Sequence, residues 1–211
     1  MTNVKICGLR TVEHALVALE AGADLLGFIL APARRQVSPA EVAAIGAAVR
    51  AAPGGDRVGL VGVFVNETPE RMAATAAECG LDALQLSGDE DPRVMCELPQ
   101  GLAIIKAIRL TSDDVEQSWL AAAGARLLVD AHVPGAYGGA GVVADWERVA
   151  DLTRNRSIML AGGLTPDNVG AAIDQVRPWS VDVSSGVEID GVKNASRIEA
   201  FIRAARTAFR D

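Results

Sequence analysis

Polar and titratable side chains stand directly after short apolar runs at several points of the chain, where folding does not require them. They include a thiol, a carboxyl group, two cations and several glycine or serine turns: Cys7, Arg35, Asn66, Ser87, Lys106, Asp130, Gly162-Gly163 and Ser184-Ser185-Gly186. Groups of these types can transfer protons and hold an anion. If the apolar runs are parallel strands of a barrel, their C-terminal ends meet at one face, so this set predicts one active site.

Strand alternation adds a second layer beneath that face. Lys5 shares a strand face with Cys7, and Asp182 shares one with Ser184. In a closed barrel the first and last strands are neighbours, so Lys5 and Asp182 should meet. A nearby ammonium favours the thiolate, which predicts a role for Lys5 in tuning Cys7. The alternative is a structural ion pair that does not influence the thiol.

Two glycine- and serine-containing turns fall where barrels commonly bind phosphate, after the seventh and eighth strands. Gly162, Gly163 and Gly186 permit close approach of backbone N–H groups to an anion. Ser184 and Ser185 add hydroxyl donors without adding charge. These turns predict phosphate binding, and the alternative is a pair of ordinary turns.

The segment 131–144 is long for a connection between strand and helix and is rich in glycine. We expect a mobile lid over the site, with a flexible connection of no function as the alternative. Residues 139–144 formally match a dinucleotide-binding pattern. They lie well beyond the preceding strand, whereas the real motif turns directly from strand into helix, so the match is rejected.

The histidines and the other cysteines give no sign of a metal site. His14 and His132 are the only histidines, and neither has a cysteine or carboxylate at metal-ligand spacing. Cys79 and Cys96 fall in helical segments and are expected to be buried, unreactive residues. Three cysteines at wide spacing predict free thiols in a reducing cytoplasm.

Eight short apolar or β-branched runs alternate with stretches of helical period, which is typical of βαβ units and a parallel sheet. The expected strands cover residues 4–7, 25–29, 58–65, 83–86, 103–107, 127–130, 158–160 and 181–183. Eight strands with eight helices fit a closed (β/α)8 barrel better than an open sheet. Closure also leaves no exposed strand edge.

The helices carry their own start and stop signals. Three of them should begin with a hydroxyl N-cap before a proline, at Ser38-Pro39, Thr68-Pro69 and Thr165-Pro166. Glu41 completes a capping box with Ser38, and Gly80 fits a left-handed C-cap. The fourth helical stretch, residues 91–97, is short and weakly marked.

Length and composition narrow the class of protein. The 211 residues, half of them apolar, suit one α/β domain, a (β/α)8-barrel catalytic domain over residues 1–211. The N-terminus lacks the apolar core of a signal peptide, and no stretch approaches the roughly 18 apolar residues of a membrane span. A net charge of −7 without a basic run argues against nucleic acid and acidic membranes as partners. We therefore expect a soluble, cytoplasmic protein.

Taken together, the segments at the strand ends resemble phosphoribosylanthranilate isomerases of tryptophan biosynthesis. The resemblance extends from Val4 to the last helix. It rests on Lys5-Ile6-Cys7-Gly8-Leu9, Gly27-Phe28, Arg35 ahead of Ser38-Pro39, Val61-Gly62-Val63-Phe64-Val65-Asn66, Leu84-Gln85-Leu86, Asp130 before Tyr137-Gly138-Gly139-Ala140-Gly141, Gly162-Gly163-Leu164 and Val181-Asp182-Val183-Ser184-Ser185-Gly186-Val187-Glu188.

This resemblance implies an Amadori rearrangement of a small phosphosugar, a step of aromatic amino-acid biosynthesis, in a monomer or homodimer without a cofactor. It implies that Asp130 is the general acid that opens the furanose ring and that Cys7 is the base at C2. Arg35 matches the family position that binds the anthranilate carboxylate, a task suited to a planar bidentate donor. Asp130 follows an apolar strand, which fits a raised pKa for a proton donor.

One segment departs from the family pattern, and two other functions remain open. The family usually has histidine and glycine after the fourth strand, where this chain has Ser87-Gly88. The histidine-pathway isomerases of the same fold have aspartates at the ends of the first and sixth strands. Here the first strand ends in Cys7 instead. A barrel that binds sugar phosphates without catalysis is the other alternative, and the presence of both Cys7 and Asp130 argues against it.

Overall fold

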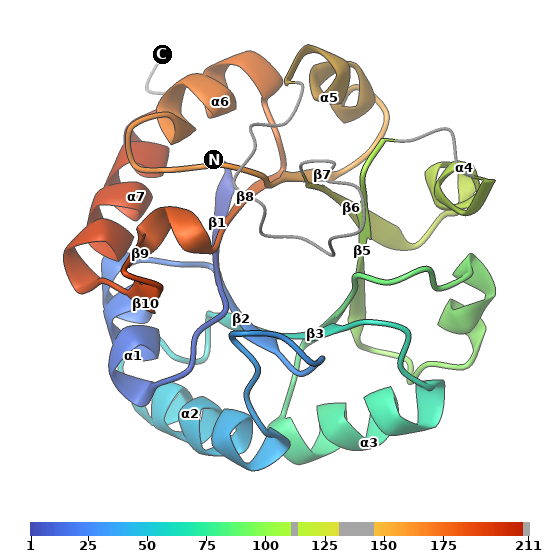
Figure 1. Ribbon diagram of the computed structural model, residues 1–211, viewed down its shortest axis with the longest axis horizontal. Coiled ribbons are helices and arrows are strands. Elements are labelled where there is room, and N and C mark those ends of the chain that lie inside the picture. The colour runs from blue at the N-terminus through green and yellow to red at the C-terminus, as the bar shows by residue number, and fades with distance from the viewer. Residues whose placement is uncertain (111–113, 131–145, 209–211) are drawn as a thin grey trace.

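The computed structural model describes residues 1–110, 114–130 and 146–208. Its parallel strands pair in chain order and close into a barrel, with β8 beside β1 (Figure 1). The strands are β1 (Asn3–Cys7), β2 (Leu25–Ile29), β3 (Gly59–Phe64), β4 (Ala83–Leu86), β5 (Ala103–Ile108), β6 (Ala125–Val129), β7 (Ile158–Leu160) and β8 (Ser180–Val183). The predicted (β/α)8 barrel is confirmed, and the expected ranges 25–29, 83–86 and 158–160 match the observed strands.

Helices surround the barrel (Figure 1). They are α1 (Val12–Ala21), α2 (Pro39–Ala51), α3 (Pro69–Cys79), α4 (Asp114–Ala121), α5 (Trp146–Thr153), α6 (Val169–Val176) and α7 (Ala195–Thr207). Two predicted N-caps are confirmed. Ser38 Oγ accepts from the backbone N–H of Glu41 at 3.3 Å, and the Glu41 carboxylate accepts in return from the Ser38 N–H at 2.7 Å. Thr68 caps α3, which ends at Gly80 in the left-handed conformation.

One expectation about the helices is refined and another is wrong. The fourth helical stretch is short, as expected, and forms a 3-10 helix, η1 (Pro92–Cys96). Thr165 does not cap the sixth helix, which begins at Val169 after Asn168. Thr165 instead closes a turn ahead of the helix: its Oγ1 accepts from the Asp167 N–H at 3.3 Å, and its own N–H donates to Asn168 Oδ1 at 2.8 Å.

The cysteines outside the first strand differ from each other. Cys79 is buried, as expected, and its thiol donates to the Pro39 carbonyl at 3.3 Å. Cys96 is exposed, which corrects the expectation that it is buried. Cys96 is the last residue of η1, which is too short to pack a buried face against the core.

The core has two parts. Buried aliphatic residues fill the space between strands and helices, and a smaller cluster fills the barrel itself: Val61, Ala83, Ile105, Leu128, Met159 and Ala161. Among the described residues, no helix combines the length and the apolar character that a membrane span requires.

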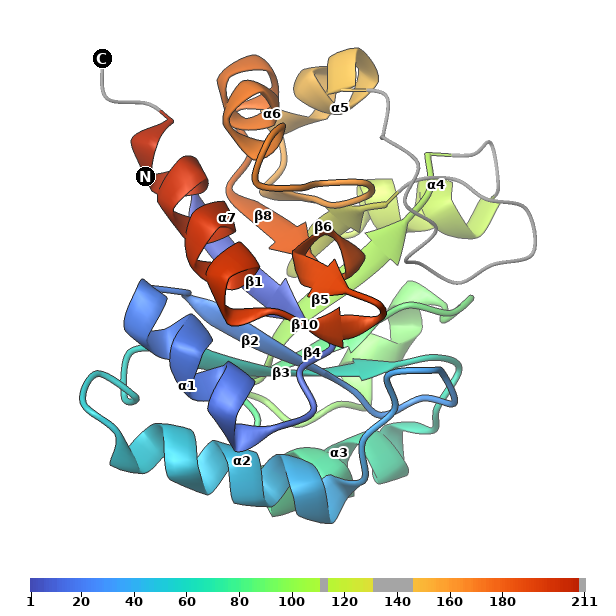
Figure 2. The same cartoon turned by 60° about the vertical axis from the view of Figure 1, so that its left-hand side comes forward.

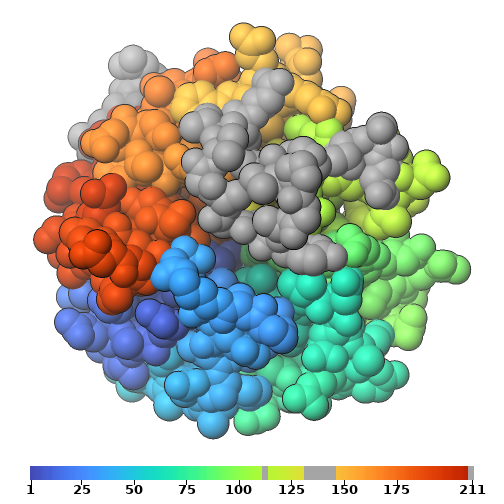
Figure 3. Space-filling model, in the orientation of Figure 1, coloured from blue at the N-terminus to red at the C-terminus, as the bar shows by residue number. Residues whose placement is uncertain are grey.

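The ends of the chain meet along one seam. Lys5 in β1 lies opposite Asp182 in β8, and Arg206 of α7 donates to the Thr2 carbonyl at 2.8 Å. After β8 the chain forms a second 3-10 turn, η2 (Ser185–Val187), and a hairpin of β9 (Glu188–Ile189) and β10 (Val192–Lys193), visible at the end of β8 in Figure 2. Figure 3 shows the blue N-terminal and red C-terminal segments adjoining on one face.

Candidate active site

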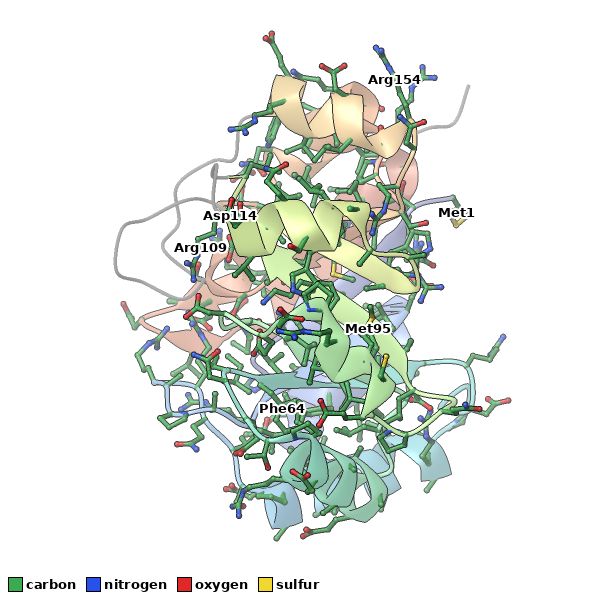
Figure 4. The ribbon with its side chains drawn as sticks, turned by 90° about the vertical axis from the view of Figure 1, so that its right-hand side faces the viewer. Met1, Phe64, Met95, Arg109, Asp114 and Arg154 are labelled. Atoms are coloured by element: carbon green, nitrogen blue, oxygen red, sulfur yellow. The ribbon has the colours of Figure 1, made fainter. Side chains whose placement is uncertain are left out.

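A cavity of about 220 Å³ opens at the C-terminal ends of the strands. Its walls include six of the side chains singled out in the sequence: Cys7, Arg35, Ser87, Lys106, Asp130 and Ser184. Arg109, also on its wall, lies at one end of the barrel in Figure 4, with Asp114, while Met1 lies at the opposite end. The strand ends therefore gather these six side chains of the predicted set at one face.

A smaller cavity adjoins the first. It is lined by both predicted anion-binding turns, Gly162-Gly163 and Ser184-Ser185-Gly186, and it shares Asp130 and Ser184 with the larger cavity. A molecule that spans the two cavities would therefore lie alongside Asp130.

The two turns are held together by close backbone packing. Gly162 and Gly163 have φ of 87° and 66°, in the region that favours glycine. A Cβ on Gly186 would lie 1.8 Å from the Leu164 carbonyl oxygen, so only glycine fits there. In the described parts of the chain, no hydrogen bond uses the N–H of Gly163, Ser185 or Gly186. These donors can therefore serve an anion.

Cys7 lies beside a fully buried lysine. The Lys5 ammonium donates to Asp182 Oδ1 at 2.9 Å and to Gln85 Oε1 at 2.8 Å, and it also contacts the Cys7 thiol. Gly27 of β2 leaves the space for this arrangement, because a Cβ there would lie 2.9 Å from Cys7 Sγ and 3.1 Å from Lys5 Nζ. The predicted contact between Lys5 and Asp182 is confirmed.

The net effect on the thiol differs from the simple expectation. Burial raises the pKa of Cys7, and Asp182 adds to that rise. Lys5 and, less strongly, Lys193 pull the pKa of Cys7 back down, but they do not cancel the effect of burial. Lys5 therefore favours the thiolate, as expected, within a site that leaves the pKa of the thiol raised overall.

Asp130 follows directly after β6 and borders both cavities. Its backbone N–H donates to the Ile108 carbonyl at 3.2 Å, which continues the pairing of β5 and β6 and fixes the start of the side chain. The residue is half-buried, next to the buried Val129. It is thus placed to reach a molecule in either cavity.

Arg35 lines the main cavity and is paired with Glu188, a residue that the sequence reasoning did not single out. Arg35 Nε lies 2.6 Å from Glu188 Oε1, and Nη2 lies 3.0 Å from Oε2. Gly8 makes room for the arginine, because a Cβ there would lie 2.7 Å from Arg35 Cδ. Burial by itself raises the pKa of Glu188, but hydrogen bonds from Arg35, Lys193 and Arg34 lower it to about 2.

Lys193 is the second residue that the sequence reasoning missed. Its ammonium donates to the Ser184 carbonyl at 2.8 Å and to Glu188 Oε1 at 2.9 Å. The side chain is only 4% exposed, although it stands in a short surface hairpin. The one available signal was the Asp190-Gly191 turn, which returns the chain toward the strand-end residues.

Lys106 belongs to a buried cluster on the wall of the cavity. Its ammonium lies 2.6 Å from Glu90 Oε2 and 2.5 Å from the Gly88 carbonyl oxygen. Asn66, at φ 51°, donates its N–H to Glu90 at 2.9 Å and does not line the main cavity. Ser87 Oγ accepts from Gln85 at 3.1 Å. Asn66 therefore supports the loops rather than facing the site.

Within residues 1–110, 114–130 and 146–208, no three His, Cys, Asp or Glu side chains form a group that could hold a metal ion. His14 Nδ1 and Thr11 Oγ1 form a hydrogen bond of 2.9 Å. His132, the expected lid at 131–144 and the rejected pattern at 139–144 lie outside the described residues.

Comparison with known proteins agrees with this geometry. The profile of the N-(5'-phosphoribosyl)anthranilate (PRA) isomerase family matches residues 4–204. The N-(5'-phosphoribosyl)anthranilate isomerase of Roseiflexus sp. (strain RS-1) is 57% identical over 212 residues, covering 99% of each chain.

Solved structures give the same assignment. Phosphoribosyl anthranilate isomerase from Thermotoga maritima superimposes with a TM-score of 0.85 at 37% identity, covering 98% of this chain and 99% of that one. Another, solved in complex with reduced 1-(o-carboxyphenylamino)-1-deoxyribulose 5-phosphate, gives a TM-score of 0.82 at 36% identity with the same coverage. This chain belongs to the N-(5'-phosphoribosyl)anthranilate isomerase family.

Proposed function

We propose that the protein isomerises N-(5'-phosphoribosyl)anthranilate to 1-(2-carboxyphenylamino)-1-deoxyribulose 5-phosphate in tryptophan biosynthesis. The observation that carries this proposal is a cavity with Cys7, Asp130 and Arg35 on its walls, joined to two glycine- and serine-lined turns. A thiol, a carboxyl group, a guanidinium and an anion cradle correspond to the needs of this substrate. The ligand bound by the similar structure carries the same carboxylate, sugar and phosphate groups.

Asp130 acts first in the proposed reaction. Its protonated carboxyl group gives its proton to the ring oxygen of the ribose, and the C1–O bond breaks to leave an iminium ion. The position of Asp130 between the two cavities supports this role, since the ribose lies between the aromatic and phosphate ends of the substrate.

Cys7 then acts as the base. The thiolate takes the proton from C2 of the iminium ion, the electron pair moves to form the enolamine, and tautomerisation gives the ketone. A raised pKa means that fewer molecules carry the thiolate at neutral pH, but that each thiolate is a stronger base. Lys5 offsets part of the burial cost of the charged form.

The remaining site residues hold the ends of the substrate. Arg35 binds the anthranilate carboxylate, for which a guanidinium offers two parallel donors. The turns Gly162-Gly163 and Ser184-Ser185-Gly186 bind the phosphate through backbone N–H groups and hydroxyls. No cofactor takes part. We further propose that residues 1–211 act as one catalytic domain, in the cytoplasm, as a monomer or homodimer.

Turnover of the substrate by the purified protein tests this function. Mixing the protein with phosphoribosylanthranilate should cause loss of the fluorescence of the substrate at a rate proportional to protein concentration. Cys7→Ser should remove nearly all of that rate while leaving the product analogue bound, because a hydroxyl of far higher pKa cannot act as the base. A wild-type protein that binds the substrate without converting it would identify a binding barrel instead.

A further inference from the structure

The carboxylate of Glu188 is shared by three cations at the edge of the main cavity. Arg35 holds both oxygens, Arg34 Nη2 lies 2.8 Å from Oε2, and Lys193 Nζ lies 2.9 Å from Oε1. The side chain of Glu188 is 6% exposed, so it is shielded from water. Each oxygen thus accepts two hydrogen bonds, which fixes the plane of the carboxylate.

The pairing uses only one edge of the Arg35 guanidinium. Nε and Nη2 donate to Glu188, whereas Nη1 takes part in no hydrogen bond among the residues that the structure describes. A guanidinium has a second bidentate edge, formed by Nη1 and the other N–H of Nη2. Arg35 lines the cavity, so this second edge is the part that a carboxylate in the cavity can use.

The charge balance around Glu188 also suits an anion. A single carboxylate near the site would repel the carboxylate of a substrate. Three cations surround this one, Arg34, Arg35 and Lys193, so the cluster has an excess of positive charge. Lys193 in addition donates to the Ser184 carbonyl at 2.8 Å, which connects the cluster to the turn after β8.

We propose that Glu188 is a positioning residue, which holds Arg35 with its Nη1–Nη2 edge toward the carboxylate of the substrate. This inference rests on the proposed function and adds a residue to it. Glu188 acts through Arg35 and does not touch the substrate. Its loss should therefore affect substrates only to the extent that they carry the aromatic carboxylate.

The test compares two substrates in two proteins. Wild type and Glu188→Gln are assayed with phosphoribosylanthranilate and with phosphoribosylaniline, which lacks the carboxylate. The amide is uncharged and has one accepting oxygen beside an NH2 donor, so it cannot accept from Arg35 Nε and Nη2 on two oxygens as the carboxylate does. We expect kcat/KM for the anthranilate to fall about tenfold or more, mostly through KM, and kcat/KM for the aniline to change less than about twofold.

Asp91→Asn is the matched control. Asp91 forms the same two-point pair with an arginine, at 2.8 and 3.1 Å from Arg93, but on the exposed surface of η1. It should leave both substrates unaffected. In an Arg35→Ala background, Glu188→Gln should cause no further loss on the anthranilate, because the residue through which it acts is gone.

Each outcome of these assays either supports or contradicts the positioning role of Glu188. If Glu188→Gln lowers kcat/KM equally for both substrates, or lowers it further in the Arg35→Ala background, Glu188 has a general structural role and the inference is wrong. If the wild type does not convert phosphoribosylanthranilate at all, the proposed function fails first and the inference falls with it. If the variant folds poorly, binding of the reduced product analogue and of inorganic phosphate is measured on its folded fraction. Loss of the first alone supports the inference, and loss of both overturns it.

Discussion

At the scale of single residues, the site sets burial against charge around one sulfur atom. Cys7 is almost fully buried, and its neighbours include both a cation, Lys5, and an anion, Asp182. The outcome is a raised pKa that would be higher still without the lysine. The proposed base is therefore a minority species in the free protein, and its abundance depends on Lys5.

Removal of that lysine should move the titration of the thiol. In Lys5→Met the rate of Cys7 alkylation by iodoacetamide should reach its midpoint at a higher pH than in the parent, because Lys5 lowers the pKa of Cys7. The exposed Cys96 would also react, so both proteins carry Cys96→Ser. Lys106→Met, which removes a buried cation from the wall of the main cavity, is the control. An unchanged midpoint in Lys5→Met would leave the lysine a purely structural role.

Asp130 should be needed for ring opening and not for binding. The amide in Asp130→Asn keeps the shape of the carboxyl group but has no proton to give at neutral pH, so kcat should fall by at least about 10²-fold with little change in affinity. Steady-state kinetics across pH, in wild type and variant, measure both effects. Parallel loss of affinity and kcat with an unaltered pH profile would mean that Asp130 only organises the neighbouring loop.

The gathering of Cys7, Arg35 and Asp130 at one cavity was the most predictable feature of the site. Cys7, Arg35 and Asp130 stand out because reactive or charged groups after buried strands have no role in folding. Glu188 and Lys193 could not be found in this way. A carboxylate and a lysine in a short polar hairpin read as surface residues, and only the packing of that hairpin against the end of β8 buries them.

At the scale of elements, the turns after β7 and β8 depend on one glycine. Because a Cβ on Gly186 would lie 1.8 Å from the Leu164 carbonyl oxygen, Gly186→Ala must push the two turns apart. We expect KM for the phosphorylated substrate to rise about tenfold or more. Inhibition by inorganic phosphate should weaken by a similar factor.

Gly170→Ala is the matched control for that change. Gly170 lies in α6 with nothing within 4 Å of the added methyl group, so this variant should keep its KM and gain about 0.5–1 kcal/mol in unfolding free energy. Equal KM values for Gly186→Ala and wild type would show that these turns do not hold the phosphate.

Local signals defined most elements, and tertiary contacts decided the exceptions. Ser38 and Thr68 start their helices because their caps are satisfied within one turn. Thr165-Pro166 carries the same signal, and Thr165 Oγ1 accepts from the Asp167 N–H at 3.3 Å, but this bond closes a turn and the helix begins only at Val169. Sequence patterns show where a cap can form, whereas the residue at which the helix then begins depends on the path of the loop.

At the scale of the whole molecule, ionic contacts join the two ends of the chain. Lys5 pairs with Asp182, Arg35 with Glu188, and Arg206 with Asp24, each across the seam where the barrel closes or beside it. The first of these pairs was predictable from strand alternation together with closure. The second was not, because it depends on the paths of two loops.

The Glu188 cluster should make the molecule sensitive to acid. The pKa of Glu188 is lowered from its usual 4.5 to about 2, so its contribution to stability is complete above pH 4.5 and is lost between pH 4.5 and 2. The difference in unfolding free energy between wild type and Glu188→Gln should therefore shrink over that range. Urea unfolding followed by circular dichroism at several pH values measures it, and a difference that stays constant would contradict the assignment.

Closure of the barrel also has a consequence for synthesis of the protein. Lys5 is translated 177 residues before its partner Asp182. Until β8 has been made, β1 has one unpaired edge and its lysine lacks the carboxylate that makes burial tolerable. The nascent chain can therefore collect its helices and central strands early. It cannot complete the catalytic face before β8 has been translated, so the activity should appear only after β8 has left the ribosome.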